Sequence, residues 1–171
     1  MIELNNFTYK TNRILFEGAN FIAPSIGIIG IAGESGCGKT TFLKIISKQI
    51  HLDSMVNTAT SIFYGNQDAL LKKDLTIAQQ FELIESIYNR EHDQNTIDEL
   101  FKNLNINANL SQKYDSCSLG EKKRIMIALS VYSNSPCIIL DEPLSSVDYE
   151  DKHSIMKLLK EYSHNRVDRK S

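Results

Sequence analysis

Hydrophobic and polar positions alternate along the start of the chain, which is typical of strands that are exposed on one face. Segments 2–9 (IELNNFTY) and 13–23 (RILFEGANFIA) carry β-branched and aromatic residues between turn formers such as Asn12 and Gly18. Segment 26–32 (IGIIGIA) is instead a short, continuous, isoleucine-rich run, the pattern of a strand buried on both faces. We therefore expect two antiparallel strands followed by a buried central strand.

Helical periodicity replaces this alternation in the middle of the chain. Segments 76–88, 96–106 and 118–132 space their apolar residues three or four positions apart, as on one face of a helix. Each segment opens with Ser or Thr three residues before Gln or Glu, which is the spacing of a capping box. The three pairs are Thr76 with Gln79, Thr96 with Glu99, and Ser118 with Glu121. Further helices are expected over 39–50 and 149–163.

Two more strands alternate with these helices. Segment 61–68 (SIFYGNQD) begins as a strand and ends in a polar loop, and segment 136–143 (PCIILDEP) is a buried strand that ends in two carboxylates. Alternation of strands and helices around buried strands predicts an α/β core. We expect one domain over residues 1–171, with a helical subdomain inserted at approximately 72–116.

Composition limits the kind of protein this chain can be. Its 171 residues, 42% of them hydrophobic, are enough for one domain with a real core. A formal net charge of -2 without a basic run argues against a dedicated nucleic-acid binder. The first ten residues lack the charged start and apolar core of a signal peptide, and the most apolar stretch, 21–32, is too short to span a membrane. We expect a cytoplasmic protein that meets a membrane only through a partner.

The three cysteines give no sign of a disulfide framework or a zinc site. They are an odd number and lack the spacing of metal ligands. Their positions are Cys37, Cys117 and Cys137. A reducing compartment fits this pattern best.

The strongest motif is a glycine-rich loop between the predicted central strand and the helix that follows it. Residues 33–40 (GESGCGKT) match G-x-x-x-x-G-K-[ST], whose glycines let backbone amides close around phosphates at a helix amino terminus. Lys39 would neutralise the β and γ oxygens, and the Thr40 hydroxyl would ligate Mg²⁺. The alternative is a plain turn with a solvated lysine. The predicted nucleotide contacts are Gly33, Glu34, Ser35, Gly36, Cys37, Gly38, Lys39, Thr40 and Thr41.

Two carboxylates end the second buried strand. By the rule for open α/β sheets, Asp141 and Glu142 lie at the sheet's carboxyl edge, near the phosphates. Asp141 can then hold the water shell of the metal, and Glu142 can orient an attacking water and accept its proton. Alone, such a pair is more often a solvated turn. A phosphate loop by itself leaves kinases, GTPases, DNA-repair clamps and transport ATPases open.

Residues 117–148 narrow this choice, because they resemble the ATP-binding subunits of ABC transporters. The family's signature reads here as CSLGE, residues 117–121, and is followed by Arg124. The family's DEP motif is present at residues 141–143, and its D-loop reads SSVD at residues 145–148. The resemblance runs from residue 1 to about residue 162. It implies a P-loop NTPase core with a mostly parallel sheet, a small N-terminal antiparallel β subdomain and an inserted helical subdomain.

The resemblance also implies roles for particular residues. Tyr9 falls where the family stacks an aromatic ring on adenine, and Gln67 where its Q-loop glutamine touches Mg²⁺. Ser118 and Gly120 would contact the ATP held by a second copy of the subunit in a head-to-tail homodimer. Catalysis is thereby assigned to Glu142, Lys39 and Gln67, and metal contact to Thr40, Gln67 and Asp141.

The same resemblance sets the expected function and its partners. We expect ATP and Mg²⁺ as cofactors, and hydrolysis that drives a separate transmembrane permease from the cytoplasmic face of the cell membrane, without direct nucleic-acid contact. One alternative is a non-transport ABC-type ATPase such as a translation or DNA-repair clamp. The other is an ATP-binding regulator that hydrolyses poorly.

The chain departs from the family in three places. Leu119 and Cys117 replace a glycine and a leucine of the signature, which weakens the expectation of hydrolysis. The stretch from Lys39 to Gln67 is shorter than usual, as if a hairpin were missing. The chain is also short at its carboxyl end: His164 comes too early for the family's switch histidine and lacks the apolar strand before it.

Overall fold

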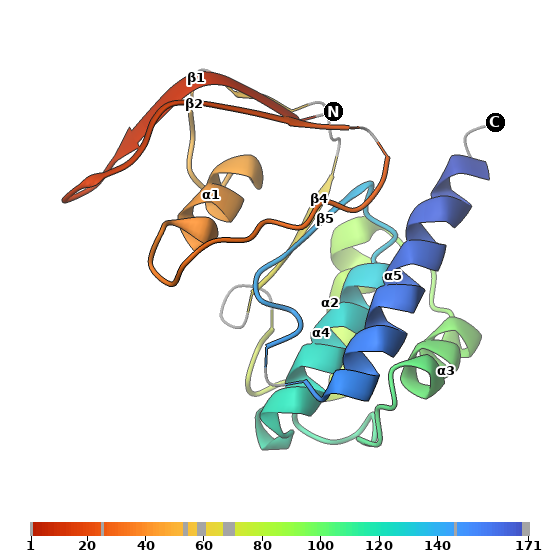
Figure 1. Cartoon of the computed structure of the whole chain (residues 1–171). Coiled ribbons are helices and arrows are strands. Elements are labelled where there is room, and N and C mark those ends of the chain that lie inside the picture. The colour runs from red at the N-terminus through yellow and green to blue at the C-terminus, as the bar shows by residue number, and fades with distance from the viewer. Residues whose placement is uncertain are drawn as a thin grey trace.

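The computed structural model describes residues 2–24, 26–52, 55–57, 61–66, 71–145 and 147–168. These residues form a mixed α/β fold with a three-stranded antiparallel sheet and a two-stranded parallel sheet (Figure 1). Helix α1 lies below the antiparallel sheet in that view, and the other helices gather on the far side of the parallel strands. The predicted α/β class and the small N-terminal antiparallel sheet are confirmed.

The antiparallel sheet has the strand order β2-β1-β3. It consists of β1 (Ile2–Lys10), β2 (Ile14–Ala23) and β3 (Met55–Asn57). Ile2 lies opposite Ala23 in one pair and opposite Asn57 in the other. The first two strands follow the predicted alternation, whereas the three residues of β3 are too few to show a pattern and were not predicted.

The parallel sheet pairs β4 (Ile62–Gly65) with β5 (Cys137–Leu140), so Ile62 lies opposite Cys137. The pairing continues past the strands, because the Asp141 amide donates to the Gly65 carbonyl at 3.0 Å. A Cβ at Gly65 would lie 2.7 Å from a methyl carbon of Leu140, so close strand contact requires glycine there.

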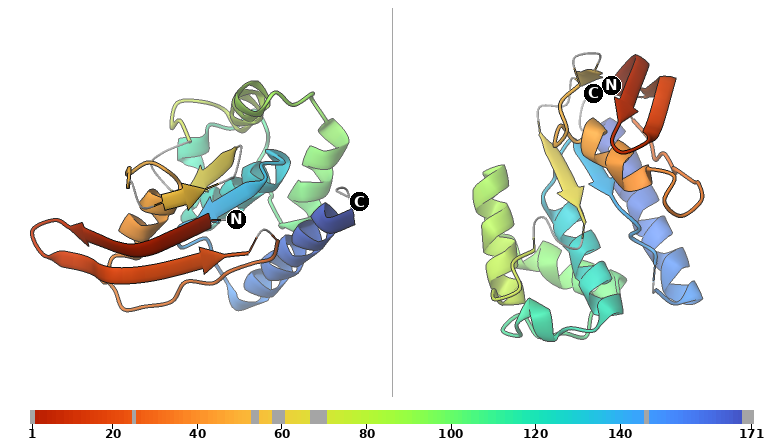
Figure 2. Two further views of the ribbon diagram at one scale, coloured as in Figure 1. Left: turned by 90° about the horizontal axis from the view of Figure 1, so that it is seen from above. Right: turned by 90° about the vertical axis from the view of Figure 1, so that its left-hand side faces the viewer.

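Helices cover both faces of this strand pair. Helix α1 (Lys39–Ile46) shares an apolar cluster with Tyr64 and Ile139. The opposite cluster contains Phe63 and is built around α4 (Leu119–Tyr132). The other elements that contribute to it are α2 (Ile77–Tyr88), α3 (Gln94–Asn103), the 3-10 turn η1 (Tyr114–Ser116) and α5 (Tyr149–Asp168). In the right-hand view of Figure 2, α2, α3 and α4 lie away from the β1–β2 hairpin, which is at the top.

Two of the three predicted capping boxes form. The Thr76 and Ser118 side chains accept from the amides three residues on, and the side chains of Gln79 and Glu121 bond back to the cap amides. The third prediction is wrong, because Asp93 caps α3 three residues before that helix's threonine. Its carboxylate accepts from both the amide and the hydroxyl of Thr96, at 3.0 and 2.6 Å. A charged acceptor three positions earlier starts the helix sooner.

Helix α1 is also shorter than predicted. It ends at Ile46 instead of residue 50, and Lys48 has a φ of +65°. A residue in the left-handed region cannot continue a right-handed helix.

The predicted central strand at 26–32 is wrong. Within the described chain, this segment pairs with no strand, and Ile28, Ile29 and Ile31 are 38–46% exposed. Glycine weakens a strand interior, and Gly27 has a φ of +120°, which breaks the extended conformation. The apolar pattern alone did not reveal this interruption.

Candidate functional site

The phosphate loop connects the exposed segment 26–32 to the amino end of α1. Gly36 and Gly38 have φ values of +76° and +105°, a conformation that other residues adopt only under strain. Lys39 folds back over the loop, and its Nζ donates to the carbonyls of Gly33 and Glu34 at 2.8 Å each. The lysine therefore lies where it can exchange carbonyl partners for phosphate oxygens.

The loop offers several unpaired backbone donors. Among the described residues, the amide of Cys37 donates to Glu34 O at 3.3 Å, whereas the amides of Gly36, Gly38 and Lys39 meet no protein acceptor. Helix α1 starts beside them with no side-chain cap. Free amides, a helix amino terminus and an ammonium form the donor set that binds polyphosphate, so these residues fit ATP.

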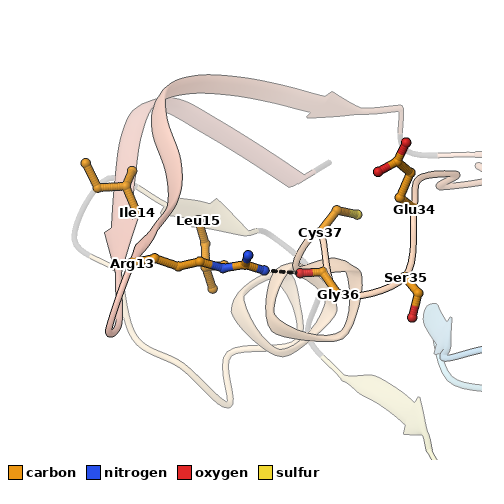
Figure 3. A pocket seen from close by; sticks show the side chains of 7 residues that line it. All are labelled: Arg13, Ile14, Leu15, Glu34, Ser35, Gly36 and Cys37. Atoms are coloured by element: carbon orange, nitrogen blue, oxygen red, sulfur yellow. Dashed lines mark hydrogen bonds between the residues drawn. The ribbon is translucent and has the colours of Figure 1, made fainter.

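The end of the β1–β2 hairpin closes one side of the loop (Figure 3). Arg13 donates from Nη2 to the carbonyl of Gly36. A cavity of about 300 Å³ lies between hairpin and loop. It is lined by Arg13, Ile14, Leu15, Glu34, Ser35, Gly36 and Cys37. Arg13 was not predicted, because a single arginine after a turn carries no motif.

The hairpin also limits which residue can stand at the helix start. A Cβ at Gly38 would lie 3.1 Å from the ring of Phe16. Phe16 in turn packs edge to face against Phe42 of α1, with ring centroids 5.8 Å apart. The hairpin, the loop and α1 are thus held as one unit.

The two predicted carboxylates follow directly after β5. Asp141 is half-buried, while Glu142 is exposed and has a φ of +49°. Because α1 packs against Ile139 of β5, the strand that carries these residues lies against the helix that follows the phosphate loop. Asp141 and Thr40 offer oxygen atoms of the kind that Mg²⁺ prefers. Within the described residues, His, Cys, Asp and Glu do not gather in threes as a metal cluster.

The signature residues form the amino terminus of α4. Ser118 is exposed and engaged in the capping box, and Gly120 is half-buried. Hydrogen bonds from the Ser118 amide and hydroxyl lower the pKa of the Glu121 carboxyl. Leu119 is 50% exposed, so its side chain stands out from the helix start.

Two predicted site residues, Tyr9 and Gln67, have not yet been placed. Tyr9 is half-buried on β1 and packs against the cluster that contains α1. Gln67 lies outside the described residues. Their assignments to adenine and to the metal stay predictions.

One buried residue near the carboxylates escaped the sequence analysis. Lys123 of α4 is 2% exposed, and its Nζ donates to the backbone carbonyl of Glu142 at 2.9 Å. Burial lowers the pKa of this ammonium, while the nearby carboxylates of Glu142 and Asp141 act in the opposite direction. The unusual burial of a lysine becomes visible only in three dimensions.

Comparison with known proteins places this site in a family. Residues 16–145 match the family described as ABC transporter. The chain is 31% identical to the cytochrome c biogenesis ATP-binding export protein CcmA of Reclinomonas americana, over 86% of this chain and 72% of that protein. It is 26% identical to the molybdate import ATP-binding protein MolC of Haemophilus influenzae, over 92% and 65% of the two chains. It spans 32% of the multidrug resistance-like ATP-binding protein MdlA of Buchnera aphidicola, at 28% identity.

Solved structures share the fold. A dimeric ATP-binding cassette in a post-hydrolysis state with ADP and Pi superimposes with a TM-score of 0.78 at 24% identity, over 97% of this chain and 84% of that one. An ATP-binding subunit of an ABC transporter gives 0.76 at 18% identity, over 96% and 75%. In the described part of this chain, no helix is long and apolar enough to cross a membrane. The chain belongs to the ABC transporter family, and its fold is that of the family's ATP-binding domains.

Proposed function

We propose that this chain is an ATPase: it binds and hydrolyses Mg-ATP as the nucleotide-binding subunit of an ABC transporter. The observation that carries the proposal is the phosphate loop itself, with free amides, Lys39 and the start of α1 on one side of a strand that Asp141 and Glu142 follow. Among the relatives of this chain, CcmA is an ATP-binding export protein and MolC is an ATP-binding import protein.

Binding rests on the loop. The amides of residues 33–39 and the ammonium of Lys39 surround the phosphates, and Ser35, Thr40 and Thr41 add hydroxyl groups. Mg²⁺, when bound, withdraws charge from the phosphate oxygens, and Thr40, Asp141 and Gln67 would hold it. Tyr9 supports the adenine.

Hydrolysis rests on Glu142. Its carboxylate is exposed beyond the end of β5, where it can orient a water molecule and accept its proton. Lys39 neutralises charge that develops on the γ-phosphate. The two functions are separable, because one depends on the loop and the other on the strand end.

Completion of the site needs a second copy of the chain. Ser118 and Gly120 lie at the capped amino terminus of α4, which attracts anions, and Ser118 is exposed. In a head-to-tail homodimer each signature would meet the γ-phosphate held by its partner's loop. One structural neighbour is a dimer with ADP and Pi.

A separate permease would carry the cargo across the membrane. The named relatives are ATP-binding proteins of transport systems, and the helical subdomain at 72–116 is the part of this chain that would dock on such a partner. The chain then acts as a single ATP-binding domain at the cytoplasmic face of the membrane.

Phosphate release by the whole chain tests this proposal. Lys39→Ala should weaken nucleotide binding by at least about tenfold, whereas Glu142→Gln should keep binding and slow turnover at least about 100-fold. Lys48→Ala, on the exposed end of the α1 region, is the matched control and should behave as wild type. Wild-type turnover by Glu142→Gln would contradict the assigned base.

A second candidate, an ATP-binding regulator with weak hydrolysis, is favoured by Leu119. Its side chain is 50% exposed where the family carries a glycine that approaches phosphate closely. Replacement of Leu119 by glycine distinguishes the regulator from the transporter ATPase. If the leucine side chain blocks closure of the dimer around ATP, Leu119→Gly should raise turnover about tenfold or more. Efficient turnover that is the same in the wild type and in Leu119→Gly argues for the transporter ATPase.

A further inference from the structure

Lys123 is a charged residue in the apolar core of the helical half. It lies on α4 between the signature and the buried residues Ile125 and Met126, and only 2% of its surface is exposed. A lysine is seldom buried unless its ammonium is bonded, because loss of water disfavours the charge. Its contact with Glu142 O, at 2.9 Å, therefore is a fixed part of the fold.

The residue at the other end of this bond has an unusual backbone. Glu142 has a φ of +49°, in the left-handed region that a non-glycine residue occupies only when its surroundings hold it there. Its carbonyl accepts from Lys123 Nζ at 2.9 Å, from Ser145 Oγ at 2.9 Å and from the Ser145 amide at 3.2 Å. Three donors on one carbonyl fix the orientation of that peptide group.

The bond holds the backbone of Glu142 and leaves its side chain unbonded. No hydrogen bond or ion pair engages the Glu142 carboxylate within the described chain, and the residue is exposed. The direction in which the carboxylate projects is then set by the backbone conformation at residue 142. Lys123 therefore supports the backbone of the base from the helix that Ser118 caps.

We propose that Lys123 is a positioning residue for hydrolysis: its bond to the Glu142 carbonyl holds the left-handed turn that aims the carboxylate at the attacking water. This role rests on the proposed ATPase function. Because α4 carries both Lys123 and the signature serine, a shift of α4 when the signature meets ATP would also move the base.

The test compares Lys123→Met, Lys123→Arg and the control Lys122→Met in the whole chain. Methionine keeps the apolar stem and removes the donor, whereas arginine keeps a charged donor. Lys122 is adjacent on α4, but its Nζ bonds instead to Asp115 O at 2.8 Å. Circular dichroism and binding of a fluorescent ATP analogue establish that each variant is folded and binds.

We expect Lys123→Met to lower kcat about 10- to 100-fold, since small misplacements of a catalytic group have effects of that size. Affinity for Mg-ATP should stay within about twofold, because the loop is untouched. Lys123→Arg should recover part of the rate, and Lys122→Met should match wild type.

A double-mutant cycle separates positioning from a general structural effect. In a Glu142→Gln background, where the base is absent, Lys123→Met should cause no further loss of turnover. An equal, additive loss in that background would overturn the inference, and so would a wild-type kcat in the folded Lys123→Met protein. A wild-type chain that binds ATP but never turns over would overturn the proposed function, and this inference with it.

Discussion

The helical half and the phosphate-loop region lie on opposite sides of the same two strands, and they are built differently. Around α4, the side chains of Ile125, Ile127 and Leu129 are completely buried. Across the strands, Ile28 and Ile29 are 46% and 44% exposed, although their segment is just as apolar. Equal hydrophobicity has therefore produced a packed core in one region and an open connection in the other.

The two regions also differ in the interactions that hold them in place. Helices α2 and α4 are fixed by capping boxes, by buried side chains and by the hydrogen bond from Tyr132 to Glu85 at 2.6 Å. The loop is held by glycine geometry and by a few bonds from Lys39 and Arg13. A region with unpaired amides gains partners when phosphate binds, so ATP should stabilise the loop more than the helices.

Replacement of one isoleucine by alanine in each region should give the largest difference in stability between the two regions. Ile127→Ala removes a fully buried side chain and should lower the free energy of unfolding by about 3–4 kcal/mol. Ile29→Ala removes a half-exposed one and should cost less than about 1 kcal/mol. Urea unfolding of the two variants measures both. Similar costs would mean that residues 26–32 are packed as tightly as α4, which breaks the comparison.

Removal of the loop's ammonium should affect binding and leave stability nearly unchanged. Lys39→Ala deletes a charged donor to phosphate, for which we expect a loss of about 1.5–3 kcal/mol of binding free energy. Titration with a fluorescent ATP analogue measures that loss, and thermal melting without nucleotide checks the fold. A large drop in the melting temperature of the free protein would assign Lys39 a structural role instead.

Two matched helix caps sharpen the comparison further. Thr76 and Ser118 make the same capping box on α2 and α4, so replacement of either by alanine should cost about 1 kcal/mol of stability. Only Ser118→Ala should also weaken ATP-dependent dimerisation, since only that cap is assigned to the partner's phosphate. Urea unfolding of both variants measures the loss of stability, and sedimentation of both with ATP measures dimerisation. If the two variants dimerise equally well, Ser118 is not part of the ATP site.

The smallest effect concerns His92 in the helical half. Glu85 accepts from its Nδ1 at 2.8 Å and raises the His92 pKa above its usual value. Stability from this pair is therefore present below about pH 6.5 and is lost as pH rises through the raised pKa. His92→Gln and Glu85→Gln should each flatten that decline in urea unfolding between pH 6 and 8. If neither variant changes the pH dependence of the free energy of unfolding, the His92–Glu85 pair contributes nothing to stability.

The sequence predicted best what depends on local chemistry. Strand alternation at 2–9, the capping boxes at Thr76 and Ser118, and the strand just before Asp141 all follow from short-range patterns. It failed where two local signals competed. Asp93 lies three residues before α3's Thr96–Glu99 pair and caps the helix first, and glycines interrupt an isoleucine-rich run that otherwise resembles a strand.

The site was foreseeable only in part for the same reason. Gly33 to Thr40 form a contiguous motif with its own spacing, so the loop was predicted from the sequence alone. Arg13 and Lys123 act through contacts with residues 23 and 19 positions away in the chain, Gly36 and Glu142. No pattern near either residue signals such a contact, because folding alone brings the partners together.

The central claim is that the phosphate loop of one copy meets the signature of another around ATP. The most direct test is the solution mass of Glu142→Gln, measured by light scattering with and without Mg-ATP, since removal of the base should trap the ATP-bound state. We predict a monomer without nucleotide and a dimer with it, and Lys39→Ala should abolish the shift. A monomer under both conditions, with ATP binding demonstrated separately, would contradict the claim.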